Sequence, residues 1–146
     1  MRVLILCTAN SARSQMAEGL LRQEAGPSCE VFSAGTKPTN VRPEAIAVMR
    51  EAGIDISGHH SKSVEDFLAQ DFDYVITVCD NARETCPVFP AQTRRIHWSI
   101  EDPAANDGSE EERLGAFRHA RDELRKRLRA FVREQATHPE EGPSNQ

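Results

Sequence analysis

Short apolar runs alternate with segments of helical periodicity along the chain, and this alternation constrains the fold more than any other feature. Four short runs read as strands, at residues 2–6, 29–35, 73–79 and 94–100. Strands that are separated by helices pair in parallel, because the chain must cross over the sheet before it can return. We therefore predict an α/β fold: a single domain with a four-stranded parallel sheet and helices on both faces.

The intervening segments have the apolar spacing and the end signals of helices. We expect helices within residues 14–26, 42–53, 63–70 and 110–135. The second begins with Pro43 in its first turn and ends at Gly53, whereas Ser63 caps the short third one. The last helix carries an apolar stripe of Leu114, Phe117, Leu124, Leu128 and Phe131.

The length of 146 residues suits one domain, which we expect to span residues 1–135. Residues 136–146 are polar and are expected to form a disordered tail. No apolar run approaches the ~20 residues of a membrane helix, and the first residues hold too short a run for a signal peptide. We expect a cytoplasmic protein with no membrane partner, acting as a monomer.

The net charge of −5 argues against a nucleic-acid partner, because proteins that bind nucleic acids are normally basic. The late basic residues alternate with acidic ones at helical spacing, which favours a solvated helix face. The five histidines are scattered or point apart, so we expect no metal site among them.

The cysteines point to chemistry rather than to structural disulfides. Such disulfides are rare in the cytosol, and no Cys-x-x-Cys pair indicates a zinc ribbon or a thioredoxin-type motif. Cys29 starts the second predicted strand, and we expect it to be an ordinary packing residue. The other cysteines are Cys7, Cys79 and Cys86.

Three reactive side chains follow predicted strands. Cys7 ends the first strand, Cys79 ends the third, and Asp102 follows the fourth. The carboxyl ends of parallel strands lie at one edge of a sheet, where α/β proteins bind their ligands. We therefore expect these side chains to converge on one site.

The turn after Cys7 has the features of an anion-binding loop. Backbone N–H groups between a strand and a helix bind anions and also stabilise a thiolate. Arg13 adds a fork of donors, and Ser14 can donate a hydrogen bond to the sulfur. Asn10 tolerates the left-handed backbone that glycine would otherwise supply. The predicted oxyanion-binding residues are Thr8, Ala9, Asn10, Ser11, Ala12 and Arg13.

The Cys-x5-Arg-Ser motif from Cys7 to Ser14, directly after a strand, resembles the signature of the low-molecular-weight protein tyrosine phosphatase fold. The resemblance covers residues 1 to about 135 and includes SAG after the second strand and EDPA in a late loop. It implies that Asp102 is a general acid. An acid opposite the nucleophile can protonate the leaving oxygen, so this implication agrees with the chemistry.

The segment VCDNARETCP resembles the thioredoxin-coupled arsenate reductases that share this fold. Phosphatase chemistry needs neither Cys79 nor Cys86, and phosphatases of this fold commonly carry aromatic residues where this chain reads DPAAND. The resemblance implies a cascade in which Cys7 attacks arsenate, Cys79 attacks Cys7, and Cys86 attacks Cys79. It implies no bound cofactor, and an external electron donor: thioredoxin, glutaredoxin or a low-molecular-weight thiol.

Two other functions remain open at this point. One is a phosphatase acting on phosphotyrosine or a small phosphoester, and the other is a non-catalytic oxyanion-binding or redox-sensing regulator. The joint presence of Cys7, Arg13, Ser14 and Asp102 speaks against the second.

The spacing of Cys79 and Cys86 sets a geometric condition on a disulfide between them. Seven helical residues span about 10 Å, whereas the Cα atoms of a disulfide lie within roughly 7 Å. If residues 80–86 are helical, the disulfide requires this segment to unwind or to form a loop, and we expect it to act as a mobile redox switch.

Two positions depart from the relatives. Ala12 stands where some members have a further loop cysteine, which the cascade does not use. Lys62 stands where some arsenate reductases place an acid beside a potassium ion, next to counterparts of Asn10, Glu18 and Ser33. We expect the Lys62 ammonium to replace that ion, so that no metal is required.

Overall fold

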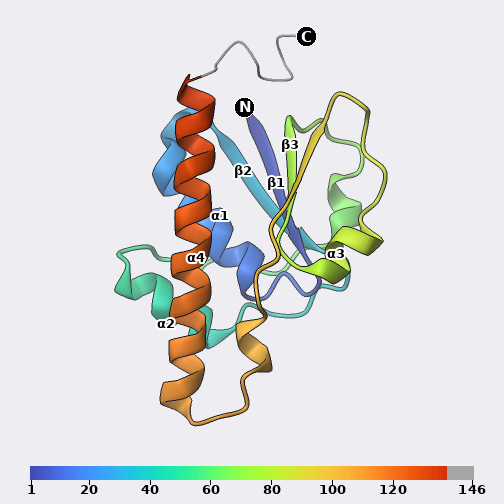
Figure 1. Ribbon diagram of the computed structural model, residues 1–146. Coiled ribbons are helices and arrows are strands. Elements are labelled where there is room, and N and C mark those ends of the chain that lie inside the picture. Colours follow the sequence, from blue (N-terminus) through green and yellow to red (C-terminus); the bar gives the residue numbers. More distant parts are fainter. Residues whose placement is uncertain (138–146) are drawn as a thin grey trace.

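A parallel sheet forms the centre of the molecule. The structure, a computed structural model, describes residues 1–137 (Figure 1). All four strands run parallel in the order β2-β1-β3-β4. This arrangement confirms the predicted α/β class and the four-stranded parallel sheet. The strands are β1 (Arg2–Cys7), β2 (Glu30–Gly35), β3 (Tyr74–Thr77) and β4 (Arg94–His97).

Helices cover both faces of the sheet, as predicted. One face is packed by α1 and α4, and α2 packs against α4 at their lower end (Figure 1). The shorter α3 and a 3-10 helix, η2, belong to the opposite side of the sheet. The bounds are α1 (Arg13–Ala25), α2 (Pro43–Glu51), η2 (Val64–Phe67), α3 (Asp80–Thr85) and α4 (Glu110–Thr137), with 3-10 turns at η1 (Gly26–Ser28) and η3 (Pro103–Ala105).

The core lies on both sides of β1. Its residues 3–6 are all fully buried, because a central parallel strand is covered on each face. On one side, Tyr74 of β3 packs edge-on against Phe131 of α4, with ring centroids 5.0 Å apart. On the other, Phe32 contacts Phe67 and Phe72. The predicted stripe on α4 is also confirmed: four of its members are buried, and Leu114 is partly buried against the core.

Several predicted element ends differ from the structure. Both β3 and β4 are shorter than predicted. After β3 the chain turns into α3, with Cys79 as its N-cap, and after His97 it leaves the edge of the sheet to form the loop that carries Asp102. The third predicted helix is only the η2 turn, capped by Ser63 as expected. Helix α4 continues through Thr137, two residues into the predicted tail, and residues 138–146 lie outside the described residues. No helix within residues 1–137 has the length and apolarity of a membrane span.

Candidate active site

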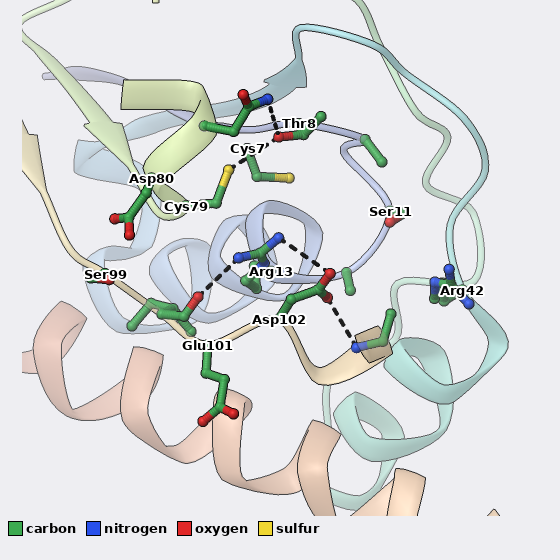
Figure 2. Close-up of a pocket in the computed structure, with 15 residues that line it drawn as sticks. Cys7, Thr8, Ser11, Arg13, Arg42, Cys79, Asp80, Ser99, Glu101 and Asp102 are labelled. Carbon is green, nitrogen blue, oxygen red and sulfur yellow. Dashed lines mark hydrogen bonds and ion pairs between the residues drawn. The ribbon is translucent and has the colours of Figure 1, made fainter. Parts of the chain in front are cut away.

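The loop after β1 and the ends of β3 and β4 enclose one pocket. Cys7, Arg13, Cys79 and Asp102 all line this pocket, whose volume is about 550 Å³. Figure 2 shows these side chains around the same space at the carboxyl edge of the sheet. The structure thus brings together the three side chains that were expected to converge, because β1 and β3 are adjacent in the sheet.

The sulfur of Cys7 is surrounded by hydrogen-bond donors. Cys7 is only 3% exposed, and its Sγ lies 2.8 Å from Ser14 Oγ. The backbone N–H of Asn10 donates to the same sulfur at 3.2 Å. Hydrogen-bond partners from the first turn of α1 and from the loop therefore converge on this sulfur.

Asn10 fixes the direction of these hydrogen bonds. Its φ of 50° is the left-handed value predicted for this position. Its Oδ1 accepts from the backbone N–H of Lys62 at 2.9 Å, so its amide nitrogen faces Ser14 at 2.7 Å and Ser33 at 3.0 Å. Since Ser14 Oγ accepts from this amide, its own hydrogen remains available to donate to Cys7.

Gly35, at the end of β2, allows the loop to approach the sheet. A Cβ atom there would lie 2.4 Å from the carbonyl oxygen of Thr8 and 2.9 Å from the backbone nitrogen of Asn10. Only glycine fits without displacing the loop. Sequence reasoning noted SAG as part of a resemblance but missed this contact, for which a strand-ending glycine was the available signal.

Cys79 occupies a similar environment. It is the N-cap of α3, and its Sγ accepts from the backbone N–H of Ala82 at 3.4 Å. Thr8 Oγ1 lies 3.3 Å from the same sulfur and itself accepts from Asn81 Nδ2 at 3.0 Å. The Thr8 hydroxyl can therefore donate to Cys79, which gives this second sulfur a backbone donor and a hydroxyl donor of its own.

Arg13 connects the anion-binding loop to the loop that carries Asp102. Its Nη1 donates to the carbonyl oxygen of Ile100 at 2.9 Å, and its Nη2 lies 3.8 Å from Asp102 Oδ2. The other carboxylate oxygen, Oδ1, accepts from the backbone N–H of Ala104 at 3.0 Å. Asp102 is therefore held at the rim of the pocket with its carboxylate half exposed.

Cys86 lies in a different cavity. It follows α3 and lines a space of about 220 Å³ together with Val75, Thr77, Arg83, Arg95, Ile96 and His97. Burial raises the pKa of the Cys86 thiol, and the nearby Arg95 guanidinium partly offsets this effect. The structure therefore does not bring Cys86 together with the sulfurs of Cys7 and Cys79. Cys29 is buried just before β2, away from both cavities.

The buried carboxylate of Glu18 lies behind the anion-binding loop and contacts residues that support it. Glu18 is 4% exposed and accepts from Ser33 Oγ at 2.5 Å, while Lys62 Nζ lies 3.7 Å from it. Arg22 and His59 also contact this carboxylate. Burial lowers the pKa of Lys62 and of His59.

These residues do not fit a resident potassium ion. An ammonium already lies beside Glu18, and Asn10 Oδ1 accepts from both Lys62 N and Gln15 Nε2. No group of three or more metal-ligating His, Cys, Asp or Glu residues occurs within the part of the chain that is described. The replacement of the ion by Lys62 stays a prediction.

Comparison with known proteins assigns the chain to a family. Residues 2–140 match the family described as low molecular weight phosphotyrosine protein phosphatase, and the chain belongs to this family. It is 43% identical to an arsenate reductase of Halalkalibacterium halodurans and 41% identical to one of Bacillus subtilis. Each alignment covers 130 residues, which is 89% of this chain and 94% of the relative.

Solved structures give the same family and fold. A structure described as an arsenate reductase in oxidized state has a TM-score of 0.79 at 34% identity, covering 91% of this chain and 97% of the other. An arginine phosphatase, YwlE, has a TM-score of 0.73 at 22% identity, which shows a common fold alone.

Proposed function

We propose that this protein is an arsenate reductase that converts arsenate to arsenite. The observation that carries the proposal is the position of Cys79, a second sulfur with its own donors, in the pocket that holds Cys7. Dephosphorylation needs one thiolate and an acid, whereas reduction also needs a second thiolate that can attack the first sulfur and so supply the electrons that arsenic takes up. The relatives named arsenate reductases support the same assignment.

Arsenate is a tetrahedral oxyanion, and the loop is suited to bind it. The backbone N–H groups of residues 8–13 and the guanidinium of Arg13 are the proposed donors to its oxygens. The Cys7 thiolate attacks arsenic, and Asp102 gives its proton to the departing oxygen, which leaves as water. The product is an arsenic–sulfur adduct on Cys7.

The reduction step is the attack of Cys79 on Cys7. A sulfur–sulfur bond forms, the sulfur–arsenic bond breaks, and its electron pair stays on arsenic, which leaves as arsenite. Arsenic is reduced by two electrons, and the two thiols become a disulfide. Cys86 then attacks Cys79, which frees Cys7 as a thiolate and leaves a Cys79–Cys86 disulfide.

The last disulfide needs two electrons and two protons from outside. Thioredoxin is the proposed donor, and glutaredoxin or a low-molecular-weight thiol would serve by the same exchange chemistry. No bound cofactor enters these steps. We propose that the protein works as a monomer in the cytoplasm, where the thiol pool keeps its cysteines reduced.

A phosphatase activity is the second candidate, because the same loop and Asp102 would also serve phosphoester cleavage. None of the described residues that line the pocket is aromatic, which leaves no ring to flank a phenyl group. This composition favours a small inorganic oxyanion over phosphotyrosine.

A coupled assay tests the proposal. Arsenate, thioredoxin, thioredoxin reductase and NADPH are supplied, and NADPH loss is followed for the wild type and for Cys7→Ser, Cys86→Ser and Cys29→Ser. We expect the wild type and Cys29→Ser to oxidise NADPH continuously in the presence of arsenate. Cys7→Ser and Cys86→Ser are expected to show no continuing oxidation. A wild type that oxidises no NADPH in response to arsenate refutes the proposal.

A further inference from the structure

Strand β4 contacts both ends of the segment that carries Cys86. At the start of α3, His97 Nε2 lies 2.8 Å from Asp80 Oδ1, and its Nδ1 lies 2.7 Å from Thr77 Oγ1. Beyond the helix, Arg95 Nη2 donates to the carbonyl oxygen of Pro87 at 2.6 Å. Residues 95 and 97 point to the same sheet face, so one edge strand holds this segment at two places.

The contact at Pro87 lies next to Cys86, in a part of the segment with little burial. Val88 is 93% exposed, and the next residue held by the core is Phe89, which packs against Phe72. The Arg95 guanidinium also lies over the Phe89 ring, 6.0 Å from its centroid. Arg95 therefore spans the exposed turn and forms a wall of the cavity that contains the Cys86 sulfur.

The folded helix α3 is incompatible with a Cys79–Cys86 disulfide. The two residues cap opposite ends of α3, and a helix of this length separates them by about 10 Å, whereas a disulfide needs Cα atoms within roughly 7 Å. Cys86 must leave its cavity, and the adjoining Pro87 must move with it. We propose that Arg95 is a positioning residue: it holds Cys86 in the dithiol form and releases the Pro87 carbonyl when the disulfide forms.

The proposal rests on the proposed function, in which this disulfide is the last intermediate. An interaction made only by the dithiol form shifts the equilibrium away from the disulfide. Replacing Arg95 by alanine is expected to raise the equilibrium constant for disulfide formation about threefold to tenfold, the range that one such hydrogen bond supplies. Arg94 provides a matched control, since it lies on the same strand but points to the opposite sheet face.

The equilibrium is measured in a Cys7→Ser, Cys29→Ser background, where Cys79 and Cys86 are the remaining cysteines. The protein is equilibrated at pH 7 with glutathione: two protein thiols and one oxidised glutathione give one protein disulfide and two reduced glutathiones. The disulfide fraction is then read by mass spectrometry after alkylation. We expect Arg95→Ala to shift it toward the disulfide, Arg95→Lys to recover part of the effect, and Arg94→Ala to leave it unchanged.

Circular dichroism first establishes that each variant is folded. Should Arg95→Ala unfold, Arg95→Met keeps the aliphatic stem over Phe89 and takes its place. An unchanged equilibrium, a shift toward the dithiol, or an equal shift in Arg94→Ala overturns the proposal. Because the equilibrium is measured without arsenate, a failed prediction for Arg95 does not affect the proposed function. Conversely, a wild type without arsenate-dependent turnover refutes the proposed function but leaves the measured thiol–disulfide equilibrium unaffected.

Discussion

Cys7 and Cys86 are the same residue type in opposite environments. The Cys7 sulfur receives hydrogen bonds from the turn between a strand and a helix, with Ser14 oriented toward it by Asn10. The Cys86 thiol instead donates to the carbonyl oxygen of Pro87 at 3.5 Å, and burial raises its pKa. The first sulfur thus accepts hydrogen bonds, whereas the second donates one. Position in the fold, rather than residue type, thus separates the environment of the proposed nucleophile from that of the last thiol in the proposed cascade.

The largest expected effect comes from removing either sulfur. Without any reductant, Cys86→Ser is expected to release a single equivalent of arsenite and then stop, because Cys7 and Cys79 still complete the first two steps. Cys7→Ser is expected to release none. Arsenite is quantified after rapid mixing with arsenate. Arsenite release by Cys7→Ser would show that the two cysteines do not differ in the way we propose.

A methyl group at Gly35 is expected to disturb the loop that surrounds Cys7 and to leave Cys86 unaffected. The added Cβ would lie 2.4 Å from the Thr8 carbonyl, so the loop must shift. We expect Gly35→Ala to lower the free energy of unfolding by about 1–3 kcal/mol, as overpacking does, and to weaken arsenate binding. Urea unfolding and arsenate titration measure the two effects.

The matched control is Gly115→Ala in α4, where an added Cβ meets nothing within 4 Å. This variant is expected to be stabilised by about 0.5–1 kcal/mol through helix propensity. Equal free energies of unfolding for Gly35→Ala and Gly115→Ala would contradict the close approach of the loop to Gly35.

Ser14 tests the hydrogen bond to the nucleophile. Ser14→Ala removes a donor to a charged sulfur, which is expected to slow the first step roughly tenfold to hundredfold. Stopped-flow measurement of the first turnover gives this rate. The exposed Ser28→Ala serves as control, and a first-turnover rate unchanged in Ser14→Ala would rule out this role.

The smallest expected effect concerns the pH dependence of Cys86 alkylation. Because burial raises the pKa of this thiol, its thiolate fraction at a given pH is lower than that of a free cysteine, and its alkylation curve lies at higher pH. Arg95→Ala is expected to move the curve further up, since the guanidinium lowers the pKa. Iodoacetamide labelling read by peptide mass spectrometry follows each site. A curve at or below that of free cysteine would contradict the contrast with Cys7.

The sequence predicted the features that local patterns determine. Strand and helix order, the loop after Cys7 and the left-handed Asn10 are all set by neighbouring residues, and the parallel topology then brings Asp102 to the same edge. The missed features depend on segments that are far apart in the chain. Gly35 meets the loop only because β2 and β1 are neighbours, and Arg95 reaches Pro87 only because β4 lies at the sheet edge.

The separation of the two cavities has a consequence for the order of events. Cys7 and Cys79 open into one space, and Cys86 into another. In the dithiol form Cys86 therefore does not face Cys7, and it reaches another sulfur only after it leaves its cavity. In the proposed cascade, Cys79 is the relay between the arsenate pocket and Cys86. We expect the external reductant to act on the disulfide that includes Cys86, and not on the loop that binds arsenate.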